Sequence, residues 1–257
     1  GKYVEIWNNV FMEYYKSKDG TYSKLKQQNV DTGMGLERIT FLLQGKTTPF
    51  DTEIFEPIME KLESLQKIDD IKSRRIIAEH LRSSMMIISD GGRPSNIDRG
   101  YILRRLIRRM TRHLNKLQIS LDELGCLIDL DIEILKEKYP DLDKNKEIIK
   151  QVILEEKDKF VKTLSHGERE FEKAIQKLKQ ENKDIVDGQT IFKLYETYGF
   201  PPEITADLAE EQGFKIDMTE FDKLFKEHQD KSRMGSEQKF KGGLADQNEQ
   251  TIKYHTA

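Results

Sequence analysis

The 257-residue sequence is poor in cysteine and has no long hydrophobic segment. Its single cysteine, Cys126, excludes an internal disulfide framework and fits a reducing compartment. Because Leu124 and Leu127 lie beside it, Cys126 is expected to be a small core residue. No apolar run approaches the roughly 20 residues that a membrane-spanning helix needs, so no membrane association is expected.

The sequence also lacks a signal peptide and a strong net charge. Without a signal peptide, the cytoplasm is the expected compartment. The formal net charge is −3, with 36% hydrophobic and 35% charged residues, a balance typical of helix-rich proteins with much exposed surface. The five histidines show no paired-ligand spacing, so no complete metal site is predicted. The chain opens inside a strand-like run and stops without a terminating signal, so we expect a fragment of a longer protein.

Residues 3–15 have the alternating pattern of a β-strand, rich in aromatic and branched side chains. An Asp19-Gly20 turn separates them from a second strand-like run over residues 21–31. An antiparallel hairpin is therefore predicted. Asn8 falls inside this hairpin among mostly apolar neighbours, so its amide is expected to find partners in the backbone or in a ligand.

The sequence DTGMGLERI, residues 31–39, places two glycines at the end of the second strand, before a predicted helix over residues 36–43. Gly33 and Gly35 leave one strand face without side chains, so that a flat ligand can lie against the backbone. Arg38, at the helix start, can meet a phosphate or stack on a base. Two glycines before a helix are common, so the pattern alone indicates a nucleotide site only weakly.

A predicted helix over residues 96–116 is the most distinctive segment. One side carries apolar residues at helical spacing, from Tyr101 to Leu114. The other side is basic, with Asp98 as the only acidic residue of the segment; it consists of Arg99, Arg104, Arg105, Arg108, Arg109, Arg112 and Lys116. Most charged helix faces are simply solvated, but unrelieved positive charge in a chain of net charge −3 favours a polyanion such as nucleic acid. Ser95 or Asn96 is the candidate N-cap of this helix, and capping by Asn96 would leave its amide N–H groups free for a base edge.

Helices dominate the rest of the sequence. A long helix is predicted over residues 145–182, with Gly167 as a candidate bend, and short helices over residues 189–198 and 203–212 flank the sequence YGFPPE. The predicted fold class is α+β and mainly α, with an antiparallel hairpin followed by a helical bundle domain.

Four sequence blocks, in order, resemble the alanyl-tRNA synthetase family of class II aminoacyl-tRNA synthetases. VDTGMGLERI is similar to motif 3 of that class, and EIWNNVFMEYY precedes it as in the family. Residues 78–109 and 193–213 resemble two further family blocks. The resemblance implies three segments: residues 1–66 as the C-terminal part of the catalytic domain, 67–233 as a helical tRNA-recognition domain, and 234–257 as a linker into an editing domain.

The resemblance also implies an activity, the ATP-dependent attachment of alanine to tRNA-Ala through an alanyl-adenylate, with ATP bound as its Mg²⁺ complex. Positioning and charge stabilisation carry this chemistry, so no catalytic side chain is assigned. Asp31 would hold the alanine ammonium group, and Arg38 would meet ATP. The remaining implied residues are Asn8, Trp7, Val10 and Gly33 for the alanine pocket, with Gly33 and Gly35 as the floor of the ATP site.

For the tRNA acceptor stem, the family reads a G·U wobble pair with residues in the blocks that contain Asn96 and Glu203. An amide and a carboxylate suit this task, because the guanine amino group needs an acceptor and the carbonyl edges need a donor. Glu203 stands where some relatives have Asp, which adds a methylene. Backbone contacts would come from Arg99, Arg104, Arg105, Arg108, Arg109 and Arg112, although those that face neighbouring helices can pair with Asp or Glu instead.

Nothing in the sequence resembles motif 1 or the motif 2 loop with its phosphate-binding arginine, so the chain alone is expected to be inactive. His255 resembles the first ligand of the zinc motif that opens the family's editing domain, where Zn²⁺ would bind. The alternative function is a non-catalytic helical RNA-binding module derived from the synthetase. Retention of Asp31, Gly33, Gly35 and Arg38 argues against it, because a binding module has no use for an amino-acid pocket.

Overall fold

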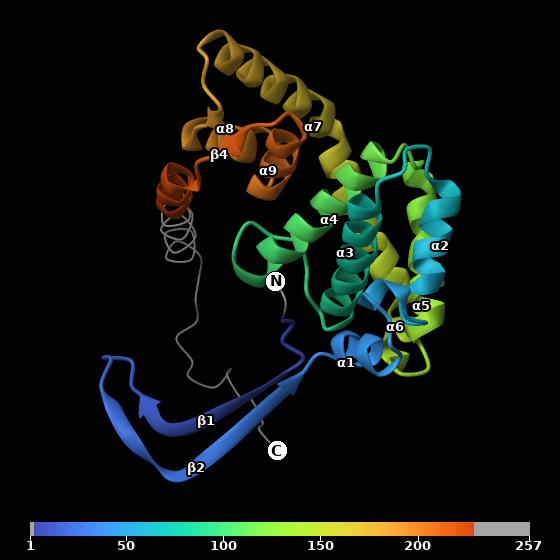
Figure 1. Cartoon of the computed structure of the whole chain (residues 1–257), viewed down its shortest axis with the longest axis vertical. Coiled ribbons are helices and arrows are strands. Elements are labelled where there is room, and N and C mark those ends of the chain that lie inside the picture. The colour runs from blue at the N-terminus through green and yellow to red at the C-terminus, as the bar shows by residue number, and fades with distance from the viewer. Residues whose placement is uncertain (1–2, 229–257) are drawn as a thin grey trace, which may run out of the picture. The chain divides into compact units, whose positions relative to one another are not determined.

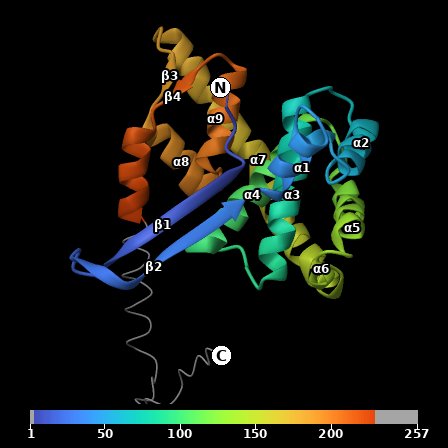
Figure 2. The same ribbon diagram turned by 60° about the horizontal axis from the view of Figure 1, so that its bottom comes forward.

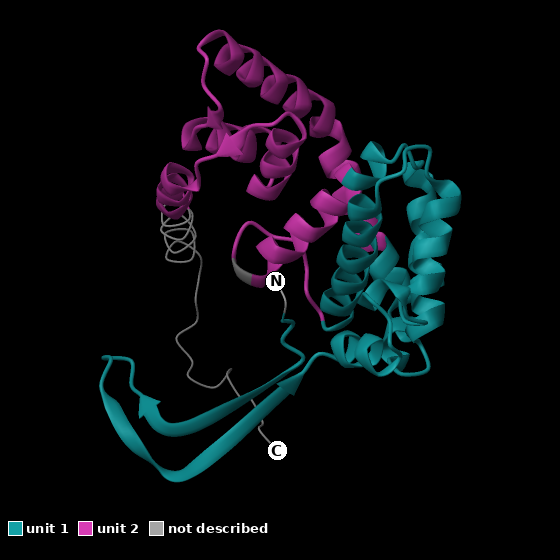
Figure 3. Cartoon of the chain, in the orientation of Figure 1, with its two compact units in different colours: residues 1–90, 113–150 teal, residues 91–112, 151–257 magenta. Residues whose placement is uncertain are grey.

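The computed structural model describes residues 3–228, apart from the side chain of Asp98. The chain divides into two compact units, drawn in different colours in Figure 3. Unit 1 comprises residues 1–90 and 113–150, and unit 2 comprises residues 91–112 and 151–257. The linker predicted over residues 234–257 lies outside the described residues, and the division at residue 66 stays a prediction.

The predicted hairpin is confirmed (Figure 1). Strand β1, Trp7–Lys16, pairs antiparallel with β2, Tyr22–Met34. The turn uses Gly20, whose φ of +88° lies in the left-handed region that glycine adopts without strain. Its amide donates to the Ser17 carbonyl at 2.9 Å. Apolar side chains of both strand faces are exposed, including Phe11, 78% accessible, so this ribbon contributes little to the core of unit 1.

Helices make up most of unit 1 beyond the hairpin. They are α1 (Leu36–Leu43), α2 (Glu56–Leu65), α3 (Ile71–Ser89), α5 (Leu124–Leu135) and α6 (Pro140–Lys144), with 3-10 turns η1 (Pro49–Asp51) and η2 (Leu121–Glu123). Asp70 begins α3, because its carboxylate accepts from the Lys72 and Ser73 amides. Helices α2, α3 and α5 contact one another, and their inner faces are fully buried at Ile58 and Leu81.

Cys126 corrects one expectation. It lies on α5 and is exposed, whereas Leu124, Leu127 and Ile128 are buried. An α-helix turns about 100° per residue, so a residue between two inward-facing leucines can still face outward. Proximity in sequence to core residues was therefore a poor indicator of burial for Cys126.

Unit 2 is built around two long helices (Figure 2). Its elements are α4 (Asp98–Lys116), α7 (Lys146–Gln180), β3 (Ile185–Val186), α8 (Gly188–Tyr198), α9 (Pro202–Glu211) and β4 (Lys215–Ile216), and residues 218–228 are also helical. The last turn of α4 and the first of α7 belong to unit 1. Phe160, Phe171 and Phe200 are fully buried in the unit 2 core. The predicted fold class, α+β and mainly α with one antiparallel hairpin, is confirmed.

Gly167 on α7 permits close packing inside unit 2. A Cβ atom at this position would lie 2.3 Å from Cε2 of Phe200, which is closer than real Cβ contacts allow. The glycine therefore makes room for the Phe200 ring, and α7 runs unbroken from Lys146 to Gln180 around it. Within residues 3–228, no helix is long and apolar enough to cross a membrane.

Candidate functional site

The hairpin register brings together four of the residues that the resemblance implies for alanine binding. Asn8 lies opposite Gly33, and Val10 lies opposite Asp31. Directly paired residues of an antiparallel ladder project to the same face, and so do alternate residues of one strand. These four residues therefore share one face. The space where a Cβ of Gly33 would stand is open, with no atom within 4 Å, so this face has room for a flat ligand against the backbone.

Trp7 lies on the opposite face of the hairpin. Its indole N–H donates to the Thr32 hydroxyl, whose own neighbour across the ladder is Asn9. Strand alternation separates Trp7 from Asn8, so a wall role for Trp7 beside Asn8 stays a prediction that the register does not favour. Asn8 is exposed, although apolar neighbours had suggested a need for partners.

Arg38 is exposed and held at the base of the hairpin. Its Nη1 donates to the Glu5 carbonyl at 2.7 Å, and the Gly35 amide donates to the Ile6 carbonyl at 3.1 Å. A Cβ at Gly35 would lie 3.2 Å from Cδ of Arg38, so glycine at this position lets the arginine fold back over the backbone. The structure thus keeps Arg38 next to the glycines, as expected. Arg38 also lines a cavity of about 740 Å³ in unit 1, together with Glu37, Phe50, Phe55, Arg82 and Met86.

The basic side of α4 is largely paired with acidic side chains. Five of its six arginines form ion pairs within unit 2: Arg104–Glu156 (3.3 Å), Arg105–Glu203 (2.9 Å), Arg108–Glu156 (2.6 Å), Arg109–Asp207 (2.9 Å) and Arg112–Glu211 (2.5 Å). The acids come from α7 and α9. Pairing with neighbouring helices, the alternative that the sequence left open, therefore accounts for most of the charge. Arg99 is exposed and has no ion pair among the described residues.

Glu156 is a buried partner of the α4 arginines that the sequence alone did not single out. It is 2% exposed and accepts two ion pairs, from Arg104 and Arg108. A signal was present in the sequence, because Ile149, Ile153, Glu156 and Phe160 follow one another at spacings of four, three and four. A glutamate on the apolar stripe of a helix needs a buried partner. The partners lie 48 and 52 residues away, on α4.

The two expected base-reading residues are each attached to α4. Arg104 Nη1 donates to Asn96 Oδ1, and Arg105 Nη1 lies 2.9 Å from Glu203 Oε1. The loop that holds Asn96 packs closely against Gly100. A Cβ atom at Gly100 would lie 2.5 Å from the Arg93 carbonyl oxygen, so only glycine allows this close packing. Neighbouring arginines of one helix thus place an amide from the loop before α4 and a carboxylate from the first turn of α9.

A cavity of about 270 Å³ lies beside these residues. It is lined by Asn96, Tyr101, Arg104, Arg105, Arg108, Tyr195, Glu196, Gly199, Pro201 and His228. Burial raises the pKa of Tyr101 and of Tyr195, so both phenols are neutral hydrogen-bond groups at neutral pH. Burial lowers the pKa of Arg108, and Glu156 opposes this shift. The lining arginines are paired with carboxylates, so their positive charge is largely neutralised. The cavity is therefore not a site for anionic ligands alone.

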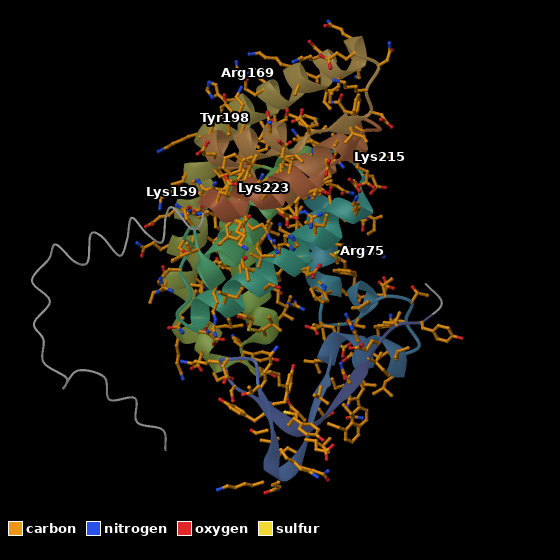
Figure 4. The ribbon with its side chains drawn as sticks, turned by 90° about the vertical axis from the view of Figure 1, so that its left-hand side faces the viewer. Arg75, Lys159, Arg169, Tyr198, Lys215 and Lys223 are labelled. Carbon is orange, nitrogen blue, oxygen red and sulfur yellow. The ribbon has the colours of Figure 1, made fainter. Side chains whose placement is uncertain are left out.

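Among the described residues, no group of three or more His, Cys, Asp or Glu side chains could hold a metal ion. His255, the expected first zinc ligand, lies outside the described residues. The side chains of unit 2 are drawn in Figure 4, where Tyr198, at the end of α8, is labelled. The Tyr198 carbonyl accepts from the Thr163 hydroxyl of α7 at 2.8 Å, which fixes the start of the loop that leads to Glu203.

Comparison with known proteins identifies the class. A sequence model of the family "tRNA synthetases class II (A)" matches residues 1–257. The chain therefore belongs to the class II tRNA synthetases, and the resemblance seen in its motifs is confirmed.

Several similar curated proteins carry the name alanine–tRNA ligase. The chain is 48% identical over 265 residues to the alanine–tRNA ligase of Borrelia hermsii (strain HS1 / DAH), covering 100% of this chain and 44% of that protein. It is 49% identical to the alanine–tRNA ligase of Treponema denticola, with the same coverage, and 41% identical over 239 residues to that of Thermotoga maritima, covering 27% of the protein. The chain thus spans less than half the length of the relatives that it matches.

Proposed function

We propose that this chain is part of an alanine–tRNA ligase, which uses ATP to form alanyl-adenylate and then transfers alanine to tRNA-Ala. The observation that carries the proposal is the hairpin register, which puts Asn8, Val10, Asp31 and Gly33 on one face. Similarity to proteins of that name along the whole chain supports it.

In this proposal each hairpin residue has a defined task. The Asp31 carboxylate accepts hydrogen bonds from the alanine ammonium group, as a charge-assisted pair. Asn8 and Val10 bound a small side-chain pocket, Gly33 leaves the backbone open to adenine, and Gly35 makes room for the Arg38 side chain. The guanidinium of Arg38 has donors beyond the one bound to Glu5, which can meet ATP phosphate. Mg²⁺, bound with ATP, would neutralise phosphate charge.

Unit 2 would contact the acceptor stem. Asn96 and Glu203 read the G·U pair, and Arg99 provides a phosphate contact because its charge is not engaged by a carboxylate among the described residues. The other arginines of α4 act mainly through their ion pairs; they are Arg104, Arg105, Arg108, Arg109 and Arg112. Most of the basic side of α4 thus holds the reading residues and α9 in place.

The test is binding of the chain to a short acceptor-stem hairpin with the G·U pair and to one with G·C, at two salt concentrations. We expect a preference of about tenfold or more for G·U, which corresponds to one good base contact of about 1–3 kcal/mol. Asn96→Ala should remove most of that preference. Arg99→Ala, the matched control, should weaken both stems equally and lower the salt dependence. Equal losses for both stems with Asn96→Ala would count against the reading role.

A non-catalytic RNA-binding module is the second candidate, favoured by the exposure of Asn8 and Asp31 in the hairpin. Pyrophosphate exchange with alanine, ATP and Mg²⁺ separates the two. Exchange that Asp31→Ala abolishes supports the ligase. Stem binding with no exchange by the protein that contains this chain supports the module.

A further inference from the structure

The amide of Asn96 is held in one orientation. Arg104 Nη1 donates to Asn96 Oδ1, and Nε of the same guanidinium lies 3.3 Å from Oε1 of Glu156. Glu156 is 2% exposed, and the Arg104 side chain is 23% exposed. The Arg104 guanidinium thus forms an ion pair with a buried carboxylate, while its Nη1 donates to the exposed asparagine.

A guanidinium group contains only hydrogen-bond donors. An asparagine amide next to it must therefore turn its carbonyl oxygen toward the arginine and its NH₂ group away. An exposed asparagine without such a neighbour can rotate by about 180° and offer either a donor or an acceptor. Arg104 removes that choice, so Asn96 presents donors.

Glu203 is treated in a matching way by the next residue of α4. Arg105 Nη1 holds Oε1 at 2.9 Å, and the Arg105 guanidinium lies 6.0 Å from the centre of the Tyr101 ring. Oε2 of Glu203 is buried and has no hydrogen-bond partner among the described residues. One carboxylate oxygen is therefore engaged by Arg105, and the other is a buried acceptor whose hydrogen-bonding capacity is unused.

We infer that Arg104 and Arg105 are positioning residues for stem recognition, which fix Asn96 as a donor and Glu203 as an acceptor. This inference rests on the proposed reading of the G·U pair and adds what sets its polarity. The guanine amino group offers a donor and a uracil carbonyl offers an acceptor, so the pair of readers matches both groups in one arrangement only. A base pair that presents its donor to Asn96 and its acceptor to Glu203 would place donor against donor and acceptor against acceptor.

A purely structural role for Arg104, as a partner for buried Glu156, makes a different prediction. Loss of that role would lower stability and weaken both stems together. Loss of the positioning role lowers the ratio of G·U to G·C affinity. Free rotation of the amide alone costs a factor of about two, and re-ordering the freed side chain costs roughly two- to tenfold more. The affinity ratio is therefore the readout that separates the two roles.

The experiment uses the whole 257-residue chain and the two acceptor-stem hairpins. Arg104→Met removes the donors and keeps the side-chain length, and we expect the G·U to G·C ratio to fall at least threefold. Arg104→Lys restores a donor-only group and should keep the ratio within twofold of wild type. The double variant Asn96→Ala/Arg104→Met should match Asn96→Ala alone. Arg169→Met, the control, removes an exposed arginine of α7 whose Nε donates to the Ser165 carbonyl of the same helix, and should leave the ratio unchanged.

Replacing the guanine with inosine, which lacks the 2-amino group, tests the second arginine. Wild type should lose affinity for the inosine stem, and Arg105→Met should lose less, because Glu203 is no longer held against the amino group.

The outcomes distinguish the proposed reading of the stem from the positioning role of Arg104. A wild-type ratio near one overturns the proposed reading of the stem and this inference with it. A wild-type preference that Asn96→Ala removes but Arg104→Met retains overturns only the positioning role. Independent losses from Asn96→Ala and Arg104→Met that multiply in the double variant would also overturn it.

Discussion

Substitution of Arg108 by alanine should damage the fold of unit 2 more than its RNA binding. The Arg108 side chain is 14% exposed, and its Nε and Nη2 atoms lie 2.7 and 2.6 Å from Oε1 of Glu156. Its Nη1 donates to the Gly199 carbonyl at 2.7 Å. Arg108 therefore joins α4 to α7 and to the loop between α8 and α9.

The magnitude follows from what alanine leaves behind. Glu156, which is 2% exposed, would keep only the 3.3 Å ion pair with Arg104. Removing one partner of a buried ion pair typically costs about 3–5 kcal/mol, because the remaining charge stays desolvated. A typical domain is stable by about 5–15 kcal/mol, so the loss is a large fraction of the total.

Urea unfolding followed by circular dichroism measures this loss. Arg99→Ala is the control, since Arg99 is exposed, and it should change the unfolding free energy by less than about 0.5 kcal/mol. Adding Glu156→Gln to Arg108→Ala should recover part of the stability, because it removes the stranded charge. A loss for Arg108→Ala no greater than that for Arg99→Ala, or a deeper loss on adding Glu156→Gln, would refute the buried ion pair as the source of this stability.

Two further substitutions test packing and charge. Gly167→Ala should lower stability by about 1–3 kcal/mol although alanine favours helix by about 1 kcal/mol, because the added Cβ overlaps the Phe200 ring; a raised melting temperature would contradict this. Asp70→Ala should cost about 0.5–2 kcal/mol at pH 7, since Asp70 caps α3. Burial acts to raise the pKa of Asp70, but hydrogen bonds from Lys116 and Ser73 outweigh it and hold the pKa below 3.8. The stabilisation is therefore present above pH 4 and lost as pH falls through the lower folded-state pKa, so wild type and variant should converge in urea titrations at acidic pH; a gap that persists would refute the pairing.

The local elements of this chain could be predicted from sequence because their signals are local. The turn at Asp19-Gly20 and the apolar spacing of α4 lie within a few residues, and the structure confirms them. Direction within an element was harder. Cys126 was expected in the core and is exposed, and Trp7 was grouped with Asn8 although strand alternation separates them.

The ion-pair partners of the basic helix could not be predicted from sequence, because they are distant along the chain. Arg109 meets Asp207, which is 98 residues away, and Arg112 meets Glu211, which is 99 residues away. No periodic pattern connects such positions. Glu156 was missed although its signal was local, since an acid on an apolar stripe predicts a buried cation even when the cation is unknown.

The shared carboxylate of Glu156 has a consequence for how this region can evolve. It serves Arg104 and Arg108 together, so one substitution at position 156 strands two cations, and a change at either arginine alters the environment of the other. Neutral drift at the three positions is then blocked one residue at a time. Related proteins should either keep all three residues or replace them together. In an alignment of relatives, we expect positions 104, 108 and 156 to covary more strongly with one another than with position 99.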